Sequence, residues 1–134
     1  MLTQVSIYAE NRRGAFQAIT GKLKKYNINI LGSVTNDSAE YGIIRMVVDK
    51  PHEAVQILTE EGTLCKCSLV IGVELNDTPG ALDELLLAML ESNIDIDYIY
   101  LCFNRENGRP ILVMHTDDAQ EVESCIRAKG FTTV

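Results

Sequence analysis

The sequence contains an internal repeat, and this repeat constrains the fold of the chain more than any other feature. Glycines recur at matching places in the two halves, at an offset of 66 residues and then of 68. The aligned pairs are Gly14 with Gly80, Gly42 with Gly108, and Gly62 with Gly130. A period that spans nearly the whole chain indicates a duplication. We therefore expect two halves of the same fold, the second longer by two residues.

Each half contains a turn that leads from an alternating apolar run into a helical pattern. These turns, called the entry turns below, are Asn11–Phe16 in the first half and Asn76–Leu82 in the second. Alternation predicts a strand before each turn, and apolar residues at helical spacing predict a helix after it. The start of a helix offers unpaired N–H groups and the positive end of the helix dipole, which suit a carboxylate or a phosphate. A capped helix without a ligand is the simpler interpretation of either turn alone.

The second entry turn has residues that suit a helix start. Asp77 or Thr78 can accept a hydrogen bond from a first-turn N–H, and Pro79 suits the first helical position. Gly80 leaves the backbone uncovered for close approach. The first entry turn has Arg12 and Arg13 instead. With the lysines that follow them, these arginines indicate a solvated basic helix face.

The periodicity predicts the order strand-helix-strand-strand-helix-strand in each half. An antiparallel sheet with both helices on one face is the ferredoxin-like architecture, an α+β fold. Asn27 is the expected left-handed terminator of the first helix. The expected strands are 3–9, 29–36, 43–48, 64–68, 70–75, 94–103, 110–115 and 131–134, and the main helices are 15–26 and 79–92.

No linker separates the halves, so we expect two rigidly joined units, residues 1–68 and 69–134. The run from Thr63 to Leu75 is strand-like, with Gly72 as its only breaker, so the boundary near Ser68 must be tight. The predicted strand 94–103 is apolar on both sides, which is typical of a strand buried by a neighbour as well as by helices. We place it at the interface of the halves.

Composition excludes several classes of protein. The 134 residues carry a net charge of −7, whereas nucleic-acid binding requires a basic face. No apolar run reaches the ~18–20 residues of a membrane span, and no signal peptide is visible. We therefore expect a cytoplasmic protein without a membrane or nucleic-acid partner.

The cysteines and histidines show no recognisable catalytic or metal-binding pattern. Cys65 and Cys67 alternate along one face of a strand and lack a second Cys/His pair at metal spacing. His52 and His115 have no Ser, Cys or acid nearby in a catalytic arrangement. Phosphate-binding glycine motifs are also missing. The chain is therefore expected to be neither an enzyme nor a metal or cofactor protein.

These features together resemble the ACT domain. The resemblance rests on the short Asn/Asp-x-x-Gly entry turn and on an Asn-Ile-Asn/Asp-Ile segment after the first helix of each half, Asn27–Ile30 and Asn93–Ile96. It covers essentially the whole chain in two tandem copies. It implies sheets that lie side by side, joined through the second strand of each unit, with ligands between an entry turn of one unit and the second strand of the other.

The resemblance implies two pseudo-symmetric binding sites for a small ligand, most often an amino acid. One would use Asn76, Asp77, Pro79, Gly80 and Ala81 with Asn29, Ile30 and Leu31; the other would use Asn11, Arg12, Gly14 and Ala15 with Asp95, Ile96 and Asp97. The ligand carboxylate would bind helix N–H groups, and its ammonium would bind Asp77 or a nearby carbonyl. Asp95 serves equally well as a ligand group or as a solvent-facing charge.

Three hypotheses of function remain, in order of preference. The first is a regulatory sensor that binds an amino acid and acts on a separate enzyme. The second is an assembly module or regulatory subunit without its own ligand, because exposed sheet edges favour pairing, including a homodimer. The third is an enzyme, because ferredoxin-like folds also support catalysis.

Overall fold

The computed structural model describes residues 1–37 and 41–134, and the chain divides into two compact units. The first unit is Thr3–Ser68. The second unit is Leu69–Val134 together with Met1–Leu2. The first two residues of the chain therefore pack with the second unit.

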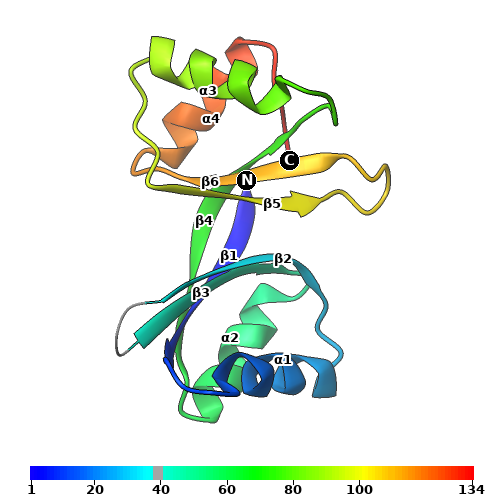
Figure 1. Ribbon diagram of the computed structural model, residues 1–134, viewed down its shortest axis with the longest axis vertical. Helices are drawn as coiled ribbons and strands as arrows, with labels where there is room; N and C mark the ends of the chain where they lie inside the picture. Colours follow the sequence, from blue (N-terminus) through cyan, green and yellow to red (C-terminus); the bar gives the residue numbers. More distant parts are fainter. Residues whose placement is uncertain (38–40) are drawn as a thin grey trace. The chain divides into compact units, whose positions relative to one another are not determined.

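The first unit has the predicted order of elements. They are β1 (Leu2–Glu10), α1 (Ala15–Lys25), β2 (Ile30–Asp37), β3 (Tyr41–Val48), α2 (Pro51–Glu60) and the first part of β4 (Leu64–Glu74). The strand order is β2-β3-β1-β4, and β3 pairs antiparallel with both β1 and β2. Both helices cover one face of this sheet (Figure 1).

The second unit repeats this arrangement. It contains the rest of β4, then α3 (Ala81–Glu91), β5 (Tyr98–Phe103), β6 (Pro110–His115), α4 (Ala119–Ala128) and β7 (Thr132–Thr133). Its strand order is β5-β6-β4-β7, the same topology as in the first unit. The prediction of two ferredoxin-like units in tandem, with antiparallel strands and helices on one face, is confirmed.

Each unit has its own hydrophobic core between its sheet and its helices. In the first core, Val5 and Ile7 of β1 pack with Leu23 of α1 and Leu58 of α2. In the second, Ile71 and Val73 of β4 occupy the corresponding place. Alternate residues of a strand point to the same face, which is why the alternating runs form these cores.

One continuous strand, β4, replaces the two strands that the sequence predicted at 64–68 and 70–75. It is the fourth strand of the first unit and the first strand of the second. Gly72 does not break it, because Gly72 lies in the ladder opposite Val113. A methyl group added at Gly72 would lie 2.7 Å from Leu2 Cδ1 and 2.7 Å from Val134 Cγ2, so this glycine permits close packing of both segments.

The strand registers locate the two extra residues of the second half. Thr35 pairs with Ile44, and Leu101 pairs with Leu112. The second strands of the units thus correspond at an offset of 66, and the third strands at 68. The extra residues therefore lie between β5 and β6, and the alignment of Gly42 with Gly108 is wrong: Gly42 lies in β3, whereas Gly108 precedes β6.

Several predicted boundaries change. Helix α3 begins at Ala81 rather than at Pro79, and β5 begins at Tyr98 rather than at Ile94. The expected turn residues on either side of residues 38–40 belong to β2 and β3, and the rest of that turn lies outside the described residues. Asn27 has a φ of 56°, which confirms it as a left-handed helix terminator, and Asn93 has the same role in the second unit with a φ of 55°.

Candidate functional site

The two entry turns have nearly the same backbone geometry. Gly14 and Gly80 are the N-cap residues of α1 and α3, with φ of 83° and 88°. Neither helix has a side-chain cap. The prediction that Asp77 or Thr78 caps α3 is therefore wrong. The left-handed glycine bends the chain through a backbone turn, in which the Ala81 N–H donates to the Thr78 carbonyl at 3.3 Å.

The space above both glycines is open. A methyl group added at either position would meet no atom within 4 Å. In the second unit, Asn76 to Gly80 are all exposed. The first-turn N–H groups are therefore not covered by a capping side chain, and a small anion could reach them.

A cavity of about 380 Å³ lies beside the entry turn of the first unit. Arg12 and Ala15, two of the predicted site residues, line it. Its rim carries both signs of charge: Arg12 Nε lies 3.7 Å from Glu10 Oε2, and Lys22 Nζ lies 2.6 Å from Glu61 Oε2. The rim of this cavity therefore offers charged groups of both signs.

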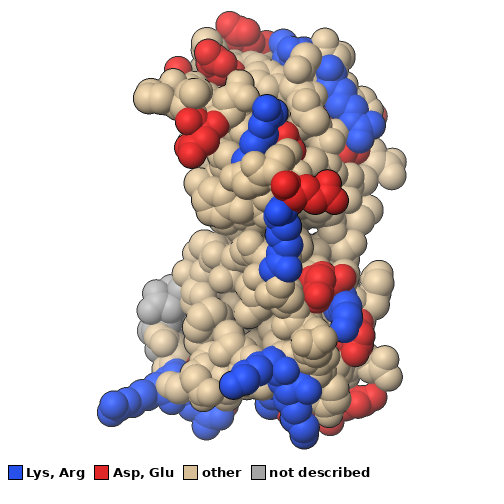
Figure 2. Space-filling model, turned by 90° about the vertical axis from the view of Figure 1, so that its right-hand side faces the viewer, with Lys and Arg blue, Asp and Glu red and all other residues tan. Residues whose placement is uncertain are grey.

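Charge distinguishes the two entry turns. The first turn of α1 contains no acidic residue, whereas the first turn of α3 contains Asp83 and Glu84. Residues 3–68 include eight Lys and Arg against seven Asp and Glu; residues 69–134 include four against twelve. Lys and Arg side chains gather at the lower end of Figure 2, whereas side chains of both signs appear at its upper end. A carboxylate would therefore be held better at the first entry turn.

A second cavity, of about 420 Å³, lies between the segment that precedes β5 and helix α4 in the second unit. Its lining includes five carboxylates: Asp95, Asp97, Asp117, Asp118 and Glu121. Asp97 also binds His115, with 2.7 Å between Asp97 Oδ2 and His115 Nδ1. The His115 ring stacks on Tyr98, with 5.1 Å between ring centroids.

Each histidine has a polar neighbour that the sequence alone does not reveal. His115 has Asp97, and His52 Nδ1 lies 3.9 Å from Cys67 Sγ. Neither pair is close in sequence, so only the pairing of strands and helices reveals them. Asp97 and the stacked Tyr98 together hold the His115 ring in place at the end of β6.

A third cavity, of about 500 Å³, lies at the start of β2 and includes Asn29 and Ile30. Asp49 uses both backbone groups of Asn29: its Oδ1 accepts from the Asn29 N–H at 2.9 Å, and its N–H donates to the Asn29 carbonyl at 3.1 Å. Ile30 and Ile96 pack against the two cores. These isoleucines therefore contribute to core packing.

Six of the predicted site residues line these three cavities. They are Arg12 and Ala15, Asn29 and Ile30, and Asp95 and Asp97. The other nine line none of the three. They are Asn11, Gly14, Leu31, Asn76, Asp77, Pro79, Gly80, Ala81 and Ile96.

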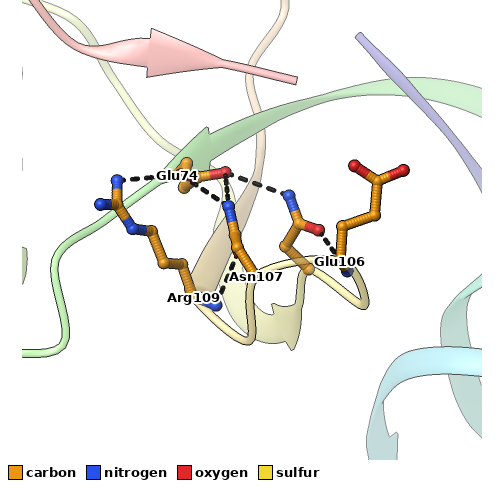
Figure 3. Close-up of polar contacts among 5 residues, drawn as sticks. Glu74, Glu106, Asn107 and Arg109 are labelled. Carbon is orange, nitrogen blue, oxygen red and sulfur yellow. Dashed lines mark hydrogen bonds and ion pairs between the residues drawn. The ribbon is translucent and has the colours of Figure 1, made fainter.

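Sequence reasoning missed a polar cluster around Glu74, at the end of β4 (Figure 3). Asn107 Nδ2 donates to both carboxylate oxygens at 3.3 Å, Asn104 Nδ2 donates to Oε2 at 3.1 Å, and Arg109 Nη1 to Oε1 at 3.2 Å. The Asn107 hydrogen bond, and then those of Asn104 and Arg109, lower the pKa of Glu74 against the effect of its burial. The cluster ties the β5–β6 turn to the strand that leads into the second entry turn.

Two of the thiols have a raised pKa. Burial raises the pKa of the Cys102 thiol, and burial together with the nearby Cys65 raises that of Cys67. Within residues 1–37 and 41–134, no three His, Cys, Asp or Glu side chains are grouped as metal ligands would be. In the same residues, every helix is too short or too polar to span a membrane.

Two ferredoxin-like units in tandem, each with a left-handed glycine at its entry turn, define a class of paired α+β domains. The family model described as "ACT domain pair" matches residues 1–134, and the chain belongs to this family. A search of curated proteins gives no match.

Solved structures show the same fold. Protein BT0572 from Bacteroides thetaiotaomicron is 26% identical, with a TM-score of 0.90 over 99% of this chain and 91% of that one. The ligand-free regulatory subunit of aspartate kinase from Thermus thermophilus is 14% identical, with a TM-score of 0.64 over 94% and 91%. Aspartate kinase from Synechocystis is 18% identical, with a TM-score of 0.60 over 98% of this chain and 26% of that one.

Proposed function

We propose that this protein is a regulatory module that binds an amino acid or a similar small zwitterion and acts on a separate enzyme. Membership of the ACT domain pair family supports a regulatory role. The fold shared with the regulatory subunit of an aspartate kinase agrees with it.

The observation that carries the proposal is the cavity at the first entry turn. Its volume of about 380 Å³ falls in the range of ~300–1,000 Å³ that is usual for small-molecule sites. The N-terminus of α1 and Arg12 would bind the ligand carboxylate, and Glu10 or Glu61 would bind its ammonium. The second entry turn and the segments at the starts of β2 and β5 remain predicted parts of the ligand-binding sites.

A thermal-shift screen against the twenty amino acids, followed by calorimetry on any hit, tests the function. A ligand at 100 times its dissociation constant should stabilise the protein by about 2.7 kcal/mol, which is several degrees in the melting temperature. If none of the amino acids shifts the melting temperature, the amino-acid proposal is wrong.

Arg12→Gln tests the site, with Arg13→Gln as its matched control. Both arginines are exposed and adjacent, but only Arg12 lines the cavity. We expect the dissociation constant of the hit to rise about tenfold in Arg12→Gln, the loss of one charge-assisted hydrogen bond. Arg13→Gln should leave it unchanged. Equal affinities in the two variants would place the ligand elsewhere.

A further inference from the structure

The cavity between the segment that precedes β5 and helix α4 has a counterpart in the first unit. At offsets of 66 and 68 residues, its lining corresponds to the residues around the cavity at the start of β2. Asn27 and Asn93 follow α1 and α3 with nearly the same left-handed φ, and Lys50 and Asp118 are the N-cap residues of α2 and α4. The two copies of the repeat can therefore be compared here position by position.

The first unit supplies its own cation at this place. Lys50 Nζ donates to the Asn27 carbonyl at 3.4 Å, so an ammonium group lies just beyond the end of α1. The carbonyl end of a helix favours a cation. Asp49 of the same unit is also occupied, because its Oδ1 accepts from the Asn29 N–H at 2.9 Å. This copy of the fold therefore binds an ammonium group that belongs to the chain itself.

The second unit lacks that cation and has additional acids instead. Three positions that are Asn, Leu or Lys in the first unit are Asp in the second: Asn29, Leu31 and Lys50 correspond to Asp95, Asp97 and Asp118. Two further acids are common to both units: Asp49 and Glu53 correspond to Asp117 and Glu121. Five positions that hold two acids and one lysine in the first unit thus hold five acids in the second.

Most of these carboxylates have no partner within the chain. Asp97 is bound to His115. Among residues 1–37 and 41–134, the other four make no ion pair and no side-chain hydrogen bond: Asp95, Asp117, Asp118 and Glu121. Helix α4 has no side-chain cap, so these acids do not serve as helix caps. Like charges that line one cavity repel one another, and a bound cation would offset this repulsion.

The buried wall of the cavity contributes a hydroxyl. Thr116 lines the cavity and is only 7% exposed. In the part of the chain that the structure describes, its side chain makes no hydrogen bond, and no fully enclosed side-chain oxygen lacks a partner. The Thr116 hydroxyl must therefore reach the open space of the cavity. Its counterpart in the first unit is Val48, a core residue, so the acceptor is particular to the second unit.

We propose that this cavity of the second unit binds an aliphatic diamine or polyamine. One ammonium group of the ligand takes the place that the Lys50 ammonium has in the first unit, beside the Asn93 carbonyl and Asp118. A second ammonium group, at the other end of a methylene chain, binds the acids of α4 around Glu121. The Thr116 hydroxyl accepts a hydrogen bond from the ligand at the buried wall.

The arrangement of the acids favours this class of ligand over others. No three acidic side chains among the described residues are grouped as metal ligands would be, so a single metal ion would contact too few of them. An elongated cation can reach acids that are spread along a cavity. The volume of about 420 Å³ is in the usual range of ~300–1,000 Å³ for small-molecule sites. An amino acid would bring its own carboxylate among five others.

Calorimetry on the full chain tests the class of ligand. The probes are putrescine and spermidine, with butylamine and Mg²⁺ as the single-ammonium and metal controls. At an ionic strength of about 0.15 M, weak surface attraction is screened. We expect one polyamine per chain, bound about tenfold or more tightly than either control. No binding of putrescine or spermidine would overturn the proposal, as would equal binding of butylamine or Mg²⁺.

Asp118→Lys tests the place, with Asp83→Lys as its matched control. Both residues are exposed acids at the start of a helix, and both changes alter the net charge equally, but only Asp118 lines the cavity. Asp118→Lys restores the lysine of the first unit and should raise the dissociation constant of spermidine about tenfold. Asp83→Lys should change it by less than about threefold. Equal losses would mean that the charge of the whole protein attracts the polyamine.

Two further variants keep the test decisive if Asp118→Lys folds poorly. Asp95→Asn and Thr116→Val each import the residue that the first unit has at the same position. Each should weaken spermidine binding, Thr116→Val by about fivefold for one hydrogen bond. Wild-type affinity in both variants would exclude this cavity. Arg12→Gln should bind spermidine as the wild type does, so this inference and the amino-acid proposal can fail separately.

Discussion

Gly80 has a φ of 88°, a conformation that costs a residue with a Cβ about 1–2 kcal/mol. The space around it is open, so the cost of Gly80→Ala comes from the backbone alone. We expect this variant to lose about 1 kcal/mol of unfolding free energy, measured by urea denaturation. Gly21→Ala, inside α1, should gain about 0.5–1 kcal/mol. A gain in both variants would contradict the left-handed geometry.

A pH-dependent prediction concerns Glu74. Its pKa lies below the ordinary value of 4.5, with the Asn107 hydrogen bond as the largest cause. A carboxyl group whose pKa is lower in the folded state adds stability above its unfolded pKa, and this stability is lost as the pH falls through the folded pKa. At pH 7, Glu74→Gln should melt below the wild type. The difference should shrink as the pH is lowered below 4.5. A difference that stays constant down to pH 3 would contradict it.

At the scale of single residues, sequence patterns could indicate which positions matter for the structure, but not always which contact each residue makes. The sequence predicts that Gly80 leaves the backbone uncovered, and no atom lies within 4 Å of a methyl group added there. Whether a helix begins with a capping side chain or with a left-handed glycine depends on backbone angles, and Asp77 and Thr78 are compatible with both. The contact of Asp97 with His115 depends on the pairing of Tyr98 with His115, which no local pattern contains.

At the scale of elements, β4 crosses the boundary between the units without a break. We expect its amide hydrogens to exchange slowly from Lys66 through Val73, because β4 is one strand that is hydrogen-bonded to both β1 and β6. Hydrogen exchange followed by NMR would resolve each amide. Fast exchange confined to Ser68 and Leu69 would mean that the boundary is a hinge.

The order of elements could be predicted because the strand and helix periodicities agree with the duplication, so each half supports the assignment of the other. The ends of the elements could not be predicted as well. Residues 94–97 have the alternation of a strand, but β5 begins only at Tyr98, where pairing with His115 starts. The strand-like run around Ser68 is compatible with one strand or with two. Whether the strand breaks there depends on the segments that pair with it, which the sequence does not show.

At the scale of the whole molecule, residues distant in sequence belong to one unit. Leu2 lies over Gly72 and packs with the second unit, although it belongs to the first half of the repeat. Leu2→Ala should therefore destabilise the chain by about 1 kcal/mol, since this leucine is half-buried. Amide exchange should accelerate in β6 and β7 and stay unchanged in β3. Acceleration in β3 instead would assign Leu2 to the first unit.

The continuous β4 also bears on how the two copies can evolve. After most gene duplications, each copy remains a module that recombination can move or replace. Here a crossover at the boundary of the repeat would cut a strand that both units use, and it would leave Leu2 with the wrong partner. The halves can therefore diverge residue by residue, but they can no longer be exchanged separately.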